Sequence, residues 1–132
     1  ISVGVGSFIP LLATSSGRVF LAHLPRPMSR RYLNQELAQA PANGKSLHKQ
    51  DINGLIADVR DKGYAYTTSR STPGLSQIEA VAAPVFDSQD QLAAVIALFD
   101  APGAITKRNK QVTDALLQVT NRISEDLGYR CG

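Results

Sequence analysis

The chain has 132 residues, 43% of them hydrophobic and 19% charged, and its formal net charge is +3. These values suit one globular domain with its own core and exclude a disordered chain. The longest apolar run, 92–99, is too short to span a bilayer, and no signal peptide opens the sequence. The chain begins at Ile1 without a methionine, so we expect a domain of a longer protein. The single cysteine, Cys131, excludes an internal disulfide framework and is typical of a cytoplasmic protein.

The first third of the chain predicts a strand and two helices. Apolar residues alternate over 3–11, which is the period of a half-buried strand. A helix is predicted over 16–24, because its apolar residues share one face and Pro25 ends it. Ser29 is predicted to be the N-cap of a second short helix.

The middle of the chain predicts a loop followed by an amphipathic helix. Residues 39–50 are polar and contain proline and glycine, which is typical of a loop. Asp51 is a suitable N-cap for the next helix, whose apolar residues repeat with helical period over 52–59. Gly63 is predicted to end this helix as its C′ residue.

The second half predicts a sheet and a long helix. Strands are predicted over 64–69, 79–86 and 92–99, and the polar residues 87–91 join the last two as an antiparallel hairpin. Because 92–99 is apolar on both faces, we expect it to be a central strand covered on both sides. A final helix is predicted over 107–127, which makes the fold class α+β. Its predicted apolar stripe is Val112, Leu116, Val119, Ile123 and Leu127.

Few residues could carry catalysis or hold a metal. Ser15 or Ser16 could be a nucleophile with His23 as its base, but these residues lie on one short predicted helix. The other histidine, His48, lies in the polar loop, and Cys131 stands alone. We therefore expect no catalytic residues, no metal site and no cofactor.

The positive net charge raises the question of nucleic-acid binding. The basic residues form two modest clusters without interleaved aromatic residues, and no recognition helix is apparent. We expect them to be solvated helix starts. The two clusters are Arg26, Arg30 and Arg31, and Lys107, Arg108 and Lys110.

The most informative local feature is the Thr-Ser-Ser-Gly segment at 14–17, just where the first helix begins. Ser15 or Ser16 is a natural N-cap, and the small residues leave the first helical N–H groups uncrowded. These N–H groups could receive a carboxylate or carbonyl of a ligand. A helix that only caps itself explains the same residues, and both interpretations stay open.

Four segments together resemble the C-terminal effector-binding domain of IclR-family transcriptional regulators. They are PLLATSSGRVFLA at 10–22, IADVRDKGY at 56–64, AAPVFD at 82–87 and ISEDLGY at 123–129. Each motif is weak by itself, but they occur in the family's order and cover nearly the whole chain.

The resemblance implies a GAF-like α+β domain over residues 1–132, with a curved antiparallel sheet, helices on both faces and a pocket on one face. It implies a cytoplasmic, non-enzymatic regulator whose N-terminal winged helix-turn-helix domain is absent from this chain. DNA would be bound only through that absent domain, and no membrane is involved. The resemblance also implies a homodimer or homotetramer and a small organic or aromatic acid as effector.

The family's pocket positions fall on seven residues of this chain. Backbone N–H groups at the helix start correspond to Ser15, Ser16 and Gly17. The family's acidic residue becomes Thr67, its cysteine becomes Ala80, and two serines of the last strand become Ala97 and Phe99. The implied effector-binding residues are therefore Ser15, Ser16, Gly17, Thr67, Ala80, Ala97 and Phe99.

These replacements remove polar groups from the implied pocket. Because each lost charge-assisted hydrogen bond is worth about 1.5–3 kcal/mol, a compact, highly charged keto acid would bind less tightly. An aromatic or otherwise apolar carboxylate suits such a pocket better. One alternative is that Phe99 fills the pocket and the domain only oligomerises, and another is a polar ligand that binds in an altered pose.

Overall fold

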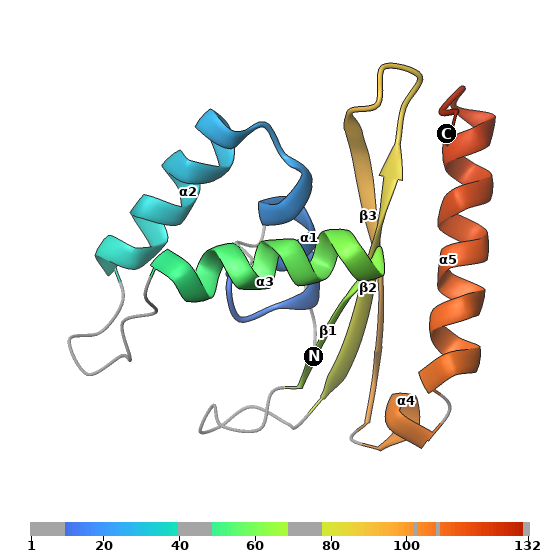
Figure 1. The fold of residues 1–132 in the computed structure, drawn as a ribbon. Coiled ribbons are helices and arrows are strands. Elements are labelled where there is room, and N and C mark those ends of the chain that lie inside the picture. Colours follow the sequence, from blue (N-terminus) through green and yellow to red (C-terminus); the bar gives the residue numbers. More distant parts are fainter. Residues whose placement is uncertain (1–9, 40–48, 69–77, 102, 108, 131–132) are drawn as a thin grey trace.

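The computed structural model describes residues 10–39, 49–68, 78–101, 103–107 and 109–130. These residues form a three-stranded antiparallel sheet with helices on both faces (Figure 1). The predicted α+β class and its layer arrangement are therefore confirmed. The helices are α1 (Ser15–His23), α2 (Arg26–Gln39), α3 (Lys49–Lys62), α4 (Ala104–Lys107) and α5 (Asn109–Asp126), and the strands are β1 (Ala65–Thr68), β2 (Glu79–Phe86) and β3 (Leu92–Asp100).

The sheet has the strand order β1-β2-β3, so β2 is central within the described residues. All residues of β2 except Phe86 are buried. The prediction that 92–99 is the central, doubly covered strand is wrong for the described structure. There β3 pairs with β2 alone and has no fully buried residue, and Leu98 and Phe99 are exposed.

One face of the sheet is covered by α1 and α3. Val19 and Ala22 of α1 and Val59 of α3 pack against Ala65 of β1 and Ala82 of β2. The sheet residues in this contact are alanines, which allow a helix to approach closely. Helix α1 therefore lies directly on the sheet, and α2 lies farther out beside α1 and α3 (Figure 1).

The opposite face is covered by α5, with α4 at its start (Figure 1). Val81 and Ala83 of β2 form a buried cluster with Ile105 and Leu116. The predicted apolar stripe of the last helix is only partly correct, since Val119 is 50% exposed and Leu127 is also exposed. The buried face instead includes three hydroxyl residues, namely Thr113, Thr120 and Ser124.

Ser124 ties α5 to β2 where the β2–β3 pairing becomes irregular. The ladder shifts register between Val85 and Phe86. There the Phe86 N–H donates to the Ser124 hydroxyl at 3.0 Å, and this hydroxyl donates to the Thr120 carbonyl at 2.8 Å. The serine side chain thus supplies a buried partner for the Phe86 N–H at the bulge.

Two predicted helix caps are wrong. Helix α2 begins at Arg26, immediately after Pro25, so Ser29 lies inside its first turns and donates to the Arg26 carbonyl at 3.2 Å. Helix α3 begins at Lys49, so Asp51 lies in its first turn, where the helix dipole still favours a carboxylate. Gly63 is confirmed as the C′ residue, with φ of 82° and its N–H bonded to the Val59 carbonyl.

Several predicted features lie wholly or mostly outside the described residues. The predicted strand over 3–11 is described only at Pro10 and Leu11, where the chain forms a turn. His48, Arg108 and Cys131 are also outside. None of the helices in the described ranges is long and apolar enough to cross a membrane.

Candidate ligand-binding site

Helix α1 is capped by Thr14, so the prediction that Ser15 or Ser16 is the cap is wrong. Thr14 has extended backbone angles, and its hydroxyl accepts from the Gly17 N–H at 2.9 Å and donates to the Pro10 carbonyl at 2.6 Å. Ser15 and Ser16 are the first two helical residues. Their N–H groups donate to no acceptor in the described part of the chain. They therefore keep the anion-binding character of a helix start.

The turn before α1 is held by two charged side chains that the sequence analysis did not single out. The Glu36 carboxylate of α2 accepts from the Leu11 N–H at 2.6 Å and the Leu12 N–H at 3.1 Å. Arg18 Nε donates to the Leu12 carbonyl at 2.8 Å. Burial lowers the pKa of Arg18, and the nearby Asp58 carboxylate opposes this shift. These contacts hold the turn against the start of α1.

Gly17 is required by the same turn. A Cβ atom at this position would overlap the Pro10 carbonyl oxygen and the Leu11 Cα. The backbone of Pro10 and Leu11, in the turn before the helix, therefore packs directly on Gly17. This close approach explains the glycine of the Thr-Ser-Ser-Gly segment without any catalytic role.

Ser15 is buried without a hydrogen-bond partner. Its exposed fraction is 0%, and its hydroxyl has no partner among the described residues. Ser15 shares a helix face with Val19 and Ala22, which pack on the sheet, so its hydroxyl also faces the sheet. A buried hydroxyl without a partner costs about 1–3 kcal/mol, so Ser15 does not stabilise the fold through a hydrogen bond of its side chain.

The predicted strand residues share one sheet face. Thr67, Ala80 and Phe99 form a single cross-strand row, because Thr67 pairs with Ala80 and Ala80 pairs with Phe99. Ala97 is two residues before Phe99 and packs in the cluster beneath α1. Since side chains two apart on a strand share a face, all four residues lie on the α1 side of the sheet.

Helix α1 points its N-terminus toward this row. At the other end of α1, the His23 ring lies edge-on against Phe86, with ring centroids 5.1 Å apart. Phe86 ends β2, and Ala80 lies near the start of the same strand. The start of α1 is therefore directed toward the Ala80 end. Within the described structure, Phe99 at this end is 53% exposed and does not fill a core.

The geometry does not support a hydrolase. Ser15 and His23 stand at opposite ends of α1, roughly 12 Å apart along the axis at about 1.5 Å per residue. The buried His23 Nε2 has no partner among the described residues. Burial lowers the pKa of His23, and the Arg60 charge lowers it further. In the described ranges, no group of three His, Cys, Asp or Glu residues could hold a metal ion.

Comparison with known proteins identifies the family. A family model described as "Bacterial transcriptional regulator IclR C-terminal" matches residues 1–125. The chain belongs to this family. The resemblance noted in the sequence is thus confirmed, and the IclR family consists of transcription factors and not of enzymes.

Several IclR-type relatives are similar along most of the chain. The Pca regulon regulatory protein of Pseudomonas putida is 25% identical over 131 residues, which are 98% of this chain and 43% of that protein. The crystal structure of Pseudomonas aeruginosa HmgR superposes with a TM-score of 0.81 at 30% identity, covering 100% of this chain and 51% of HmgR. The chain thus spans about half or less of these relatives.

A second similar structure contains a ligand. It is the inducer-binding domain of a double mutant of PobR from Acinetobacter, in complex with 3-hydroxybenzoic acid. It superposes with a TM-score of 0.62 at 21% identity and covers 91% of this chain and 68% of that chain. At this identity the likeness shows a common fold.

Proposed function

We propose that this IclR C-terminal domain binds an aromatic or otherwise apolar carboxylate between the start of α1 and the sheet. The observation that carries the proposal is the buried Ser15 hydroxyl, which lacks a described partner beside two helical N–H groups that also lack one. A buried polar group without a hydrogen-bond partner lowers the stability of the fold. A ligand-binding role is one reason for a protein to retain such a group.

The acidic end of the ligand is assigned to the helix start. Its carboxylate accepts from the N–H groups of Ser15 and Ser16 and from the Ser15 hydroxyl, and the positive end of the helix dipole favours the charge. Gly17 does not donate, because Thr14 already accepts from its N–H. Its role is to let the turn pack close to the helix.

The body of the ligand is assigned to the sheet. Ala80, Ala97 and Phe99 present methyl groups and an aromatic ring on the same face as Thr67, which has a single hydroxyl. An apolar surface with a few polar anchors suits an aromatic acid better than a compact keto acid. The complex of the related PobR domain with 3-hydroxybenzoic acid supports this class of ligand.

The alternative of a purely oligomerising domain requires Phe99 to fill the site. Its side chain is 53% exposed, which favours an open face over a filled one. We therefore prefer the ligand-binding interpretation.

For the whole protein, we propose an N-terminal winged helix-turn-helix domain outside residues 1–132 as the DNA-binding part. We further propose that the cytoplasmic regulator is a homodimer or homotetramer. The ligand would then change DNA binding through its different affinities for two arrangements of the assembly.

The test is thermal denaturation of the chain with benzoate, 3-hydroxybenzoate and phenylacetate. Acetate and pyruvate are controls that have a carboxylate but no large apolar group. Benzyl alcohol is a control that has the aromatic ring but no carboxylate. At a ligand concentration of 100 times Kd, binding adds about 2.7 kcal/mol to the free energy of unfolding. For a domain of this size, that raises Tm by on the order of 10 °C.

Ser15→Ala is the matched site variant, because it removes the hydroxyl and keeps the helix. We expect it to reduce the shift caused by the aromatic acids. The proposal fails if pyruvate stabilises the chain more than every aromatic acid, or if no acid stabilises it at all.

A further inference from the structure

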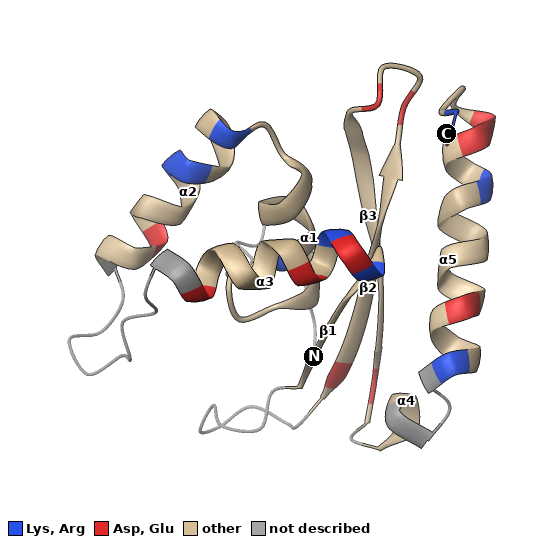
Figure 2. Ribbon diagram, in the orientation of Figure 1, with Lys and Arg blue, Asp and Glu red and all other residues tan. Residues whose placement is uncertain are grey.

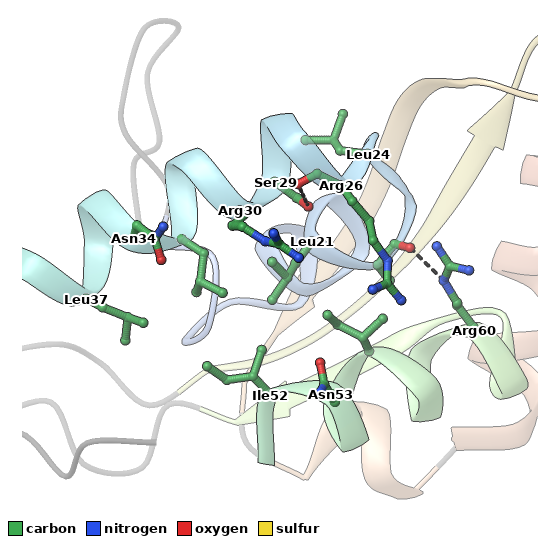
Figure 3. Close-up of a pocket in the computed structure, with 13 residues that line it drawn as sticks. Leu21, Leu24, Arg26, Ser29, Arg30, Asn34, Leu37, Ile52, Asn53 and Arg60 are labelled. Atoms are coloured by element: carbon green, nitrogen blue, oxygen red, sulfur yellow. Dashed lines mark hydrogen bonds between the residues drawn. The ribbon is translucent and has the colours of Figure 1, made fainter. Parts of the chain in front are cut away.

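A hollow lies where α2 passes over α1 and α3 (Figure 3). Its volume is about 470 Å³, within the range typical of small-molecule sites. None of the seven residues of the proposed effector site lines it. The groove is therefore a separate place on the molecule.

The walls of this groove are mainly aliphatic. Leu21 of α1, Leu33 and Leu37 of α2, and Ile52 and Ile56 of α3 all line it. Leu37 is 38% exposed, so the groove is open to solvent. Such walls favour a ligand with an apolar body over a fully polar one.

Three arginines line the same groove. Arg26 and Arg30 come from the first turns of α2, and Arg60 comes from the last turn of α3. Figure 3 shows the Arg26 and Arg60 guanidinium groups at one end of the groove, with Arg30 farther along α2. None of the described residues that line the groove is acidic, and in the same part of the chain none of these arginines forms an ion pair.

The position of the α2 arginines is electrostatically unfavourable without an anion. They lie at the positive end of the helix dipole, and the first turn of α2 contains no acidic residue (Figure 2). The N–H groups of Met28 and Ser29 already donate to the Pro25 carbonyl, each at 3.0 Å. An anion at this site would therefore be bound by the guanidinium groups.

Arg60 is held in place by the protein itself. Its Nε donates to the Ala22 carbonyl at the end of α1, at 2.8 Å. The bond leaves the outer guanidinium N–H groups facing the groove end, where Arg26 also points (Figure 3). A fixed guanidinium is a suitable carboxylate partner, because less side-chain entropy is lost on binding.

We propose that this groove is a second ligand site, which binds an organic acid with an extended apolar body. The body lies along the leucine and isoleucine walls, and the carboxylate meets Arg26, Arg30 and Arg60. The aliphatic walls do not suit a nucleic-acid backbone, and the limited volume suits a small molecule better than a folded acidic partner. Aliphatic and arylalkanoic acids share this chemistry.

In the experiment, the Ser15→Ala variant of the chain is titrated with octanoate and with 4-phenylbutyrate at constant ionic strength. Binding is measured by NMR chemical shifts and by calorimetry. The Ser15 variant is used so that binding at the start of α1 contributes little. 1-Octanol is the control that has the apolar chain without the carboxylate, and acetate is the control that has the carboxylate without the long apolar chain. We expect saturable binding of at least one acid, with both controls at least about 10-fold weaker.

The variants separate the groove from general surface charge. The double variant Arg26→Gln with Arg30→Gln should lower the affinity for octanoate at least about 10-fold. Arg31 is on the same helix but outside the groove, so Arg31→Gln should leave this affinity unchanged. Leu37→Ser should also lower the affinity for octanoate, because it removes part of the apolar wall. All four substituted side chains are exposed, so folding is not at risk.

Several results would overturn the proposal. Among them are an equal affinity for 1-octanol, an equal affinity for acetate, a loss of binding in Arg31→Gln as large as in the double variant, and a failure of both acids to bind. Octanoate-dependent association of two chains across the groove would also overturn it. Because effector binding is tested with Ser15 intact, either proposal can fail without the other.

Discussion

Two buried serines in this domain have opposite surroundings. Ser124 accepts from the Phe86 N–H and donates to the Thr120 carbonyl, whereas the Ser15 hydroxyl has no partner among the described residues. A hydroxyl with two partners stabilises the fold, and one without a partner does not. The difference separates a serine that holds two elements together from one to which we assign ligand binding in the proposed function.

We predict that Ser124→Ala lowers the free energy of unfolding by about 1–3 kcal/mol, because the Phe86 N–H loses its partner. Ser15→Ala should leave the free energy unchanged or raise it by up to about 1 kcal/mol, since it removes an unpartnered group and improves helix propensity. Urea denaturation of the ligand-free chain measures both. A comparable loss in the two variants would show that Ser15 has a structural partner.

His23 predicts a pH dependence of stability. Burial and the Arg60 charge lower its pKa in the folded state, so below about pH 6.5 the unfolded chain binds more protons than the folded chain. The stability is therefore complete above this pH and decreases as the pH falls toward the lower folded pKa. Urea denaturation at pH 8 and at pH 5.5 should show the decrease in the wild type.

His23→Gln should show a smaller decrease than the wild type over the same range. The control is His48→Gln, which changes the other histidine of the chain. If the decrease disappears in the His48 variant and persists in the His23 variant, His23 is not its source.

At the scale of elements, the position of α1 depends on its contact with the preceding turn. Gly17→Ala should lower the free energy of unfolding by about 1–3 kcal/mol, because its Cβ would overlap the Pro10 carbonyl and Leu11 Cα. Gly54 is the matched control, since a Cβ there meets nothing within 4 Å and the residue lies inside α3. Gly54→Ala should raise the free energy by about 0.5–1 kcal/mol.

Circular dichroism and urea denaturation measure both glycine variants. Gly17→Ala should also weaken binding of the proposed effector, because it moves the N–H groups of Ser15 and Ser16. If both variants are equally stabilising, the turn adjusts without loss and Gly17 does not fix the start of α1.

Elements whose own residues determine them could be predicted from the sequence. The strand over 79–86 has the observed bounds of β2, and the first helix differs from α1 by one residue at each end. Strand order could not be predicted in the same way. Residues 92–99 are apolar on both faces, but burial depends on which helices cover β3, and such contacts are distant in the sequence.

The candidate site shows the same limit. The Thr-Ser-Ser-Gly segment identified the helix start, but its cap is Thr14, and the Glu36 carboxylate that holds the turn comes from another helix. No local pattern connects Glu36 with Leu11, which are far apart in the chain. The same is true of Arg60 and Ala22, so the arginine groove becomes visible only in the structure.

The whole molecule has one sheet layer that serves two helical layers. Ala82 of β2 packs beneath α1 and α3, and its neighbours Val81 and Ala83 pack beneath α5. Both helical layers bury apolar side chains against this strand. The two faces should therefore lose their structure together.

We predict one cooperative unfolding transition. Val81→Ala on the α5 face and Val59→Ala on the α1 face should each lower the free energy of unfolding by about 1–3 kcal/mol, through lost burial and a small cavity. Because β2 joins the faces, each variant should accelerate amide hydrogen exchange in α1 and α5 equally at the slowest-exchanging positions. If Val81→Ala accelerates exchange in α5 alone, α5 opens separately from the layer that contains the effector site. A ligand bound at the start of α1 would then stabilise only the α1 face, whereas in a single cooperative unit the same ligand also slows exchange in α5.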